Sequence, residues 1–212
     1  MKFDTLLSLT RDLPWFDLPT IVQSVDEPRS TLVNQLHRWV KSGRLVSLRR
    51  GMYAVSDLYR RKTLNPAEVA NGIYVPSYLS GLWTMSYFGL LPERVVTYTS
   101  VTSRVTRSFS NTLGEFHYSN IKQSAFFGYQ SIEMDGVQVC MALPEKAILD
   151  HWHLASGKWT ESRMMEMRYQ NTELIDPEKL SAFADRFESP RLARAARLWN
   201  DLDFDDHGVE IE

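Results

Sequence analysis

A helical pattern followed directly by a β-hairpin pattern occupies residues 28–55 of the chain. Pro28 favours the start of a helix that continues to Ser42, and Gly43 stands where a left-handed residue commonly ends a helix. Apolar side chains recur on one side of this helix at the spacing i, i+4, i+7 and i+8, namely Leu32, Leu36, Trp39 and Val40. The pattern therefore predicts a helix with one buried face and one free face.

A short basic turn between two apolar runs follows that helix. Residues 45–48 and 52–55 are predicted to pair as strands, and Gly51 can adopt the positive φ that a tight turn requires. Two shorter helices are predicted earlier, over residues 2–10 and 18–25, with Asp17 as the N-cap of the second. Three short helices followed by a hairpin are typical of a winged helix-turn-helix domain.

Basic side chains gather in the same region. The chain has a formal net charge of −2, but residues 1–62 carry 11 Lys and Arg against 6 Asp and Glu, whereas residues 161–212 carry 7 against 13. Within residues 28–62, nine basic side chains accompany a single acid, Asp57. Such a local excess favours a polyanionic partner, although a solvated helix face would have the same composition.

The free face of the third predicted helix carries side chains suited to reading DNA. Arg and Asn can form paired hydrogen bonds with guanine and adenine edges, whereas Ser and Lys reach phosphate. A basic hairpin tip would lie over the sugar-phosphate backbone. The predicted contacts to double-stranded DNA are Arg29, Ser30, Asn34, Arg38 and Lys41 of the helix, and Arg49 and Arg50 of the hairpin. A winged helix can also bind another protein, and that alternative stays open.

The rest of the chain mixes helical and β-rich patterns. A short helix is predicted over residues 66–71, closed by Gly72, and a buried apolar helix over residues 77–88, with Ser77 as its N-cap and Trp83 in the core. Strand-like runs cover residues 94–100, 105–110 and 114–121, and Asp135-Gly136 is the strongest hairpin signal in the chain. Helices are predicted over residues 143–153, 160–169, 176–187 and 189–202.

The change in pattern and charge near residue 63 predicts two domains. Residues 1–62 are expected to form a winged helix-turn-helix DNA-binding domain, and residues 63–212 a mixed α/β domain that ends in helices. The predicted fold class is therefore α+β. With 212 residues, including 6 Trp, 9 Tyr and 10 Phe, the chain is long enough to build a core in each domain.

Several short motifs occur in a characteristic order over most of residues 5–155. They are residues 43–45 with residues 49–53; Pro66 with residues 68–70; residues 75–89 (VPSYLSGLWTMSYFG) with residues 91–93; residues 126–128; residues 135–137; and residues 143–150 (LPEKAILD). In order and spacing these motifs resemble the AbiEi family of bacterial antitoxins. That family consists of predicted transcriptional regulators of viral (phage) defence in type IV toxin-antitoxin systems.

The resemblance implies a function for each domain. The N-terminal winged helix would act as a transcriptional repressor of its own toxin-antitoxin operon by binding the operator, and the C-terminal domain would be needed for antitoxicity. The implied second partner is a cognate nucleotidyltransferase-like toxin, which such antitoxins counteract functionally rather than through a stable complex.

No group of side chains has the spacing that catalysis or metal binding requires. His151 and His153 on a helix would point about 200° apart, and the only further ligands nearby are Cys140, predicted to be buried, and Asp150. A Gly-rich phosphate loop is absent from the sequence. We therefore predict no catalytic residues, no metal, no cofactor and no enzymatic activity. The alternative is a DNA-targeted nuclease or metal-dependent hydrolase with an active site in the C-terminal domain.

The sequence also favours a cytoplasmic location without a membrane partner. It has no run of about 18 apolar residues, the length that a transmembrane helix needs. An acid and a hydroxyl, Asp4 and Thr5, stand where a signal peptide has its apolar core. The single cysteine, Cys140, is typical of a protein without disulfide bonds.

Overall fold

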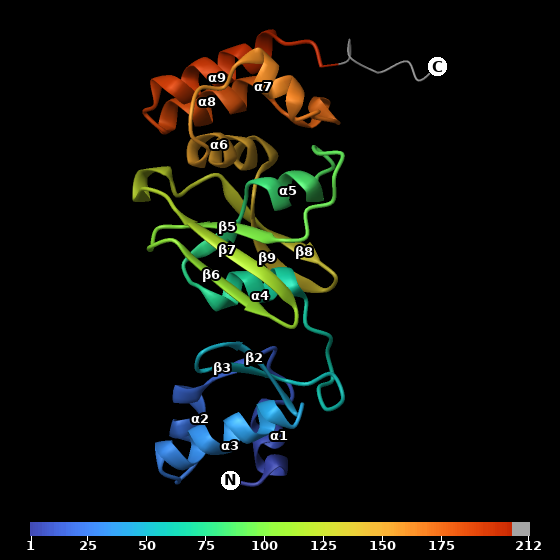
Figure 1. Cartoon of the computed structure of the whole chain (residues 1–212), viewed down its shortest axis with the longest axis vertical. Helices are drawn as coiled ribbons and strands as arrows, with labels where there is room; N and C mark the ends of the chain where they lie inside the picture. Colours follow the sequence, from blue (N-terminus) through green and yellow to red (C-terminus); the bar gives the residue numbers. More distant parts are fainter. Residues whose placement is uncertain (205–212) are drawn as a thin grey trace, which may run out of the picture.

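Three helices and a small antiparallel sheet form residues 1–55 of the computed structural model, which describes residues 1–204 (Figure 1). The elements are α1 (Phe3–Thr10), β1 (Phe16–Asp17), α2 (Leu18–Ser24), α3 (Arg29–Lys41), β2 (Leu45–Arg49) and β3 (Met52–Val55). The strand order is β1-β3-β2, so β3 pairs with both of its neighbours. The predicted helices and hairpin of this region are confirmed.

Local interactions explain where these elements begin and end. The Asp17 carboxylate accepts a hydrogen bond of 2.9 Å from the backbone N–H of Thr20, which caps α2 as predicted. Gly43 and Gly51 have φ values of +71° and +78°, which side chains with a Cβ rarely adopt. Leu32 and Leu36 are fully buried, so the apolar stripe of α3 faces the core of this region.

A six-stranded mixed sheet with helices around it forms the remainder of the described chain. In chain order the elements are α4 (Pro66–Ile73), β4 (Ser77–Leu79), α5 (Leu82–Tyr87), β5 (Tyr98–Thr102), β6 (Arg107–Asn111), β7 (Gly114–Asn120), the 3-10 turn Gln123–Ala125, β8 (Tyr129–Met134), β9 (Val137–Ala142), α6 (Pro144–Leu154), α7 (Glu161–Glu166), the 3-10 turn Thr172–Leu174, α8 (Pro177–Arg186) and α9 (Pro190–Asp201). The strand order is β6-β7-β5-β4-β9-β8. The β4–β9 and β5–β7 pairs are parallel and the others antiparallel. The protein is therefore of mixed α and β structure.

The predicted helix over residues 77–88 is wrong in its first part. Ser77–Leu79 form a central strand, β4, and α5 begins only after Gly81, whose φ is +66°. Tyr78 and Leu79 are both fully buried, and they belong to cores on opposite faces of the sheet. A strand buried on both faces is a continuous apolar run, which periodicity cannot distinguish from a buried helix. Ser77 consequently does not cap a helix.

Two further expectations in this region need correction. Gly72 does not close its helix, because α4 continues to Ile73. Its hydrogen atom faces the ring of Trp15, and a Cβ at this position would lie 2.3 Å from Trp15 Cζ2. Trp83 is only half-buried, so it is not a core residue.

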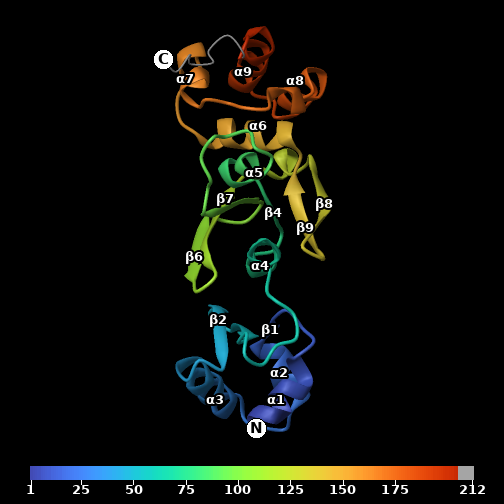
Figure 2. The same cartoon turned by 90° about the vertical axis from the view of Figure 1, so that its right-hand side faces the viewer.

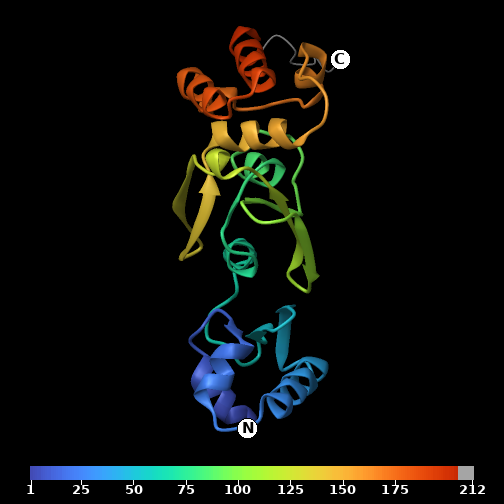
Figure 3. The same ribbon diagram turned by 90° about the vertical axis from the view of Figure 1, so that its left-hand side faces the viewer.

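The hairpin of the N-terminal region shares a core with the large sheet. Leu48 and Met52 are buried in one cluster with residues of α4 and of the large sheet, although the two sheets remain separate. Residues 56–65, which include the predicted boundary at 62–63, contain no helix or strand. In Figures 2 and 3, α3, β2 and β6 lie on the same side of the elongated molecule.

The far end of the molecule is helical. α6 lies against the large sheet, and α7, α8 and α9 cover α6 (Figure 1). The end of the predicted 63–212 domain, residues 205–212, lies outside the described residues. Among residues 1–204, no helix combines the length and the hydrophobicity that crossing a membrane requires.

Candidate nucleic-acid interface and buried charge network

The polar face of α3 is a free surface. Every predicted contact residue on this helix is solvent-exposed: Arg29, Ser30, Asn34, Arg38 and Lys41. Within residues 1–204, none of these five side chains forms a hydrogen bond or an ion pair. Their donors and acceptors are therefore available to a partner without breaking any internal contact.

The hairpin tip is in the predicted place, but its two arginines differ. Arg50 is exposed. Arg49 is half-buried, and its Nε donates a hydrogen bond of 2.8 Å to the carbonyl oxygen of Ile73 at the end of α4. Its Nη1 donates to the Arg50 carbonyl oxygen at 3.2 Å. Arg49 thus joins the hairpin to the large sheet region, and a phosphate would have to use the N–H groups that remain.

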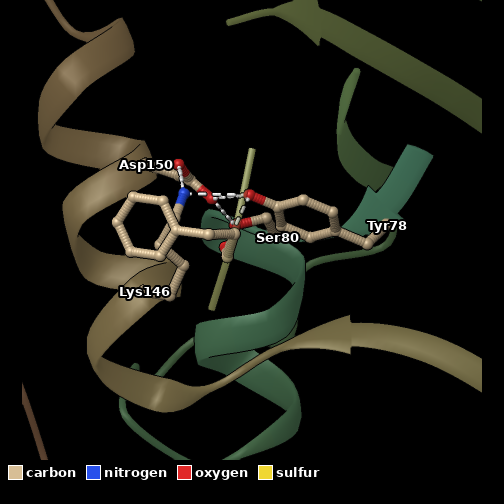
Figure 4. Close-up of polar contacts among 5 residues, drawn as sticks. Tyr78, Ser80, Lys146 and Asp150 are labelled. Carbon is tan, nitrogen blue, oxygen red and sulfur yellow. Dashed lines mark hydrogen bonds and ion pairs between the residues drawn. The ribbon is translucent and has the colours of Figure 1, made fainter. Parts of the chain in front are cut away.

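A second cluster of charges lies inside the molecule, between α6 and the strand β4. Lys146 and Asp150 are one helical turn apart on α6 and form an ion pair in which both side chains are fully buried. The same carboxylate accepts hydrogen bonds from Ser80 Oγ at 2.6 Å and from Tyr78 OH at 3.2 Å. Lys146 Nζ also donates to Tyr78 OH at 2.9 Å (Figure 4). We call these four residues the buried charge network.

Burial shifts the proton equilibria of the network. Removal from water lowers the pKa of Lys146 and raises that of Asp150, and the attraction between the two charges opposes both shifts. The pKa of Tyr78 is raised, first by burial and then by the nearby Asp150 carboxylate. The rings of Phe127 and Phe187 lie 5.0 and 4.7 Å from Lys146 Nζ. A paired lysine enclosed in this way is not placed to meet a substrate.

The spacing of Lys146 and Asp150 is a sequence signal for this network. Lys146 and Asp150 stand four residues apart in a helix whose intervening positions are Ala, Ile and Leu. Charges at i and i+4 within an apolar run indicate a buried pair, because each can compensate the other. Tyr78 and Ser80, the other members, could not be found from spacing, since they come from a segment predicted as helix.

The residues considered for metal binding have other contacts. The rings of His151 and His153 pack against Trp159 and Phe187, with centroids 5.4 and 5.1 Å apart. Cys140 is half-buried rather than buried, and its backbone N–H and carbonyl oxygen bind the side chain of Asn71 at 2.6 and 3.1 Å. In the described part of the chain, no three His, Cys, Asp or Glu side chains are close enough together to hold a metal ion.

Comparison with known proteins adds no relative, because no family model matches this chain and no curated protein matches it significantly.

Proposed function

We propose that this chain is a DNA-binding antitoxin that represses its own toxin-antitoxin operon and counteracts a nucleotidyltransferase-like toxin. The single observation that carries the DNA-binding part is the free polar face of α3, followed directly by a hairpin. In helix-turn-helix proteins the second helix of the motif enters the major groove with its N-terminal residues against base edges. Arg29, Ser30 and Asn34 lie in the first two turns of α3.

The charge distribution supports the same surface. Arg38 and Lys41 extend the basic face toward the end of α3, and Arg50 lies at the tip of the following hairpin. Basic side chains at the ends of a reading helix suit the phosphates on either side of the groove. We assign base contacts to Arg29 and Asn34, and phosphate contacts to Ser30, Arg38, Lys41 and the hairpin arginines.

Titration of the promoter fragment in front of the gene tests this proposal. Arg29→Ala and Asn34→Ala should each weaken operator binding by about 1–3 kcal/mol and change binding to a scrambled duplex little, because base contacts carry the sequence information. Arg197→Ala removes an exposed arginine from α9, far from α3, and is the matched control. Equal affinity of the wild-type protein for operator and scrambled DNA would contradict the proposal.

The antitoxin part rests on the family resemblance, so it needs a separate test. Co-expression with a nucleotidyltransferase-like toxin encoded beside the gene should rescue growth. Arg29→Ala should keep this rescue while losing repression, because antitoxicity is assigned to the C-terminal region. Trp152, fully buried on α6, should be needed for rescue, since its truncation costs about 3–5 kcal/mol of folding free energy. If Arg29→Ala abolishes rescue, the division of labour between the regions is wrong.

We also propose that the chain has no enzymatic activity of its own. Lys146 and Asp150, the charged groups of the buried charge network, are fully buried and satisfy each other. No observation favours the nuclease or hydrolase alternative. Plasmid nicking by untagged protein that is lost in His153→Ala, or one equivalent of tightly bound zinc, would overturn this proposal.

A further inference from the structure

Four arginines from separate parts of the chain surround one pocket between the hairpin and the large sheet. The pocket has a volume of about 370 Å³. Arg49 and Arg50 come from the β2–β3 hairpin. Arg104 comes from the loop before β6, and Arg107 is the first residue of β6. Tyr74, which follows α4, lies among them. We call this the junction pocket.

Internal contacts position three of the four arginines of the junction pocket. The guanidinium carbons of Arg104 and Arg107 lie 4.4 and 5.7 Å from the ring centroid of Tyr74. Arg104 Nη1 donates to the carbonyl oxygen of Val75 at 3.1 Å, and Arg49 Nε is held by Ile73. The Tyr74 ring is buried, and its hydroxyl donates to the Val105 carbonyl oxygen at 3.1 Å. Arg49 and Arg104 are therefore held in place before any ligand arrives, whereas Arg50 and Arg107 are exposed and donate no internal hydrogen bond in the described chain.

In the described part of the chain, no carboxylate forms an ion pair with these four arginines. Asp17, whose pKa is lowered slightly by Arg49 in addition to its main hydrogen bonds with Thr20, is occupied as the cap of α2. Four like charges around one cavity repel one another, and an anion bound between them removes that repulsion.

We propose that the junction pocket binds the phosphate group of a compact phosphorylated ligand, of the nucleotide class. Guanidinium groups match phosphate oxygens with paired, charge-assisted hydrogen bonds. The half-buried ring of Phe109, which also lines the pocket, adds a surface on which a base can stack. A concave site with fixed donors suits such a ligand better than the convex surface of a duplex. This site is distinct from the α3 face and does not depend on operator binding.

Calorimetric titration of the full chain in a chloride buffer tests the proposal, with inorganic phosphate, pyrophosphate and ATP as probes. The wild-type protein should bind at least one of them. Arg107→Gln should weaken that binding about tenfold or more, because it removes a charge-assisted hydrogen bond. Arg107 is exposed and donates no internal hydrogen bond in the described chain, so the variant should fold. Arg197→Gln on α9 is the matched control and should bind as the wild type does.

A second arm separates a compact ligand from the phosphates of DNA. Arg104→Gln and Arg107→Gln should leave the affinity for operator and scrambled duplex unchanged, while the phosphate probes lose affinity. If no probe binds the wild-type protein, the pocket does not serve a compact ligand and the proposal is overturned. If both variants weaken duplex binding, the pocket serves the phosphates of DNA, and the proposal is overturned too. Unchanged probe binding in Arg107→Gln would overturn it as well.

Discussion

Charged side chains on α3 and on α6 occupy opposite environments. Arg29 of α3 is exposed and forms no hydrogen bond or ion pair in the described chain. Lys146 and Asp150 of α6 are fully buried and are satisfied by each other and by Ser80 and Tyr78. An exposed charge costs little in folding and stays available to a partner. A buried ion pair can affect the binding of a partner only through the fold, because each charge compensates the other inside the protein. The comparison separates the proposed binding surface on α3 from a structural element on α6.

The largest expected difference between the two regions is in stability. Asp150→Ala leaves the Lys146 ammonium buried without its counter-charge, so the free energy of unfolding should fall by about 3–5 kcal/mol. Arg29→Ala should change it by no more than about 0.5 kcal/mol, since its side chain is exposed. Urea denaturation followed by fluorescence measures both.

A double variant tests whether the unpaired buried charge causes this loss of stability. Replacing both charges, as Lys146→Met with Asp150→Leu, removes the unpaired charge and should be less destabilising than Asp150→Ala alone. If the double variant is the less stable of the two, the pair contributes net stability beyond mutual compensation. If Asp150→Ala lowers the free energy of unfolding by less than about 0.5 kcal/mol, the buried charge network is not tightly enclosed.

The next effect is a dependence of stability on pH that comes from the α6 region. Burial, assisted by the charge of Arg163, lowers the pKa of His151 from 6.5 to about 4. The unfolded chain therefore binds a proton between these two pKa values that the folded chain does not bind. Stability should fall as the pH decreases from about 6.5 to 4, by up to about 3 kcal/mol. Burial also lowers the pKa of His153, which acts in the same direction.

Urea denaturation at several pH values between 4 and 7 measures this loss. In His151→Gln the loss should be clearly smaller, because the titrating group is gone. His37→Gln, on the exposed face of α3, is the matched control and should retain the wild-type dependence. Equal losses in the wild-type protein and His151→Gln would place the titration elsewhere.

The N-terminal region was largely predictable from the sequence because its signals are local. A stripe of apolar residues defined α3, Asp17 defined the start of α2, and Gly43 and Gly51 marked the turns. The exposed face of α3 followed from the same periodicity. Each of these features depends on residues within a few positions of one another.

The C-terminal region was less predictable because its decisive contacts join distant segments. β4 lies between β5 and β9, so its buried apolar residues lack the alternation that marks a half-exposed strand. Ser80 and Asp150 meet across 70 positions, and Arg50 and Arg107 face the same pocket from different sheets. Only tertiary structure places such residues together.

The smallest predicted effect concerns the phosphate contacts proposed for the α3 surface and the hairpin. Each lost phosphate contact should reduce the slope of log K against log salt concentration by about 0.9. Lys41→Ala, at the end of α3, and Arg50→Ala, at the hairpin tip, should each do so on operator and scrambled duplex alike. Arg197→Ala should retain the wild-type slope. Binding titrations at several salt concentrations measure these slopes.

The two variants also decide how far the DNA interface extends. Arg50 is exposed at the hairpin tip but also borders the junction pocket, so it stands between the two proposed surfaces. If Lys41→Ala flattens the slope and Arg50→Ala does not, DNA lies along α3 without reaching the hairpin, and the backbone contact assigned to Arg50 is wrong. If both flatten it, the DNA backbone reaches the edge of the junction pocket. A nucleotide in the pocket would then compete with duplex DNA for Arg50. A titration of duplex in the presence of ATP should therefore show a reduced affinity for duplex in the wild-type protein. In Arg107→Gln, which binds the nucleotide more weakly, ATP should not reduce it.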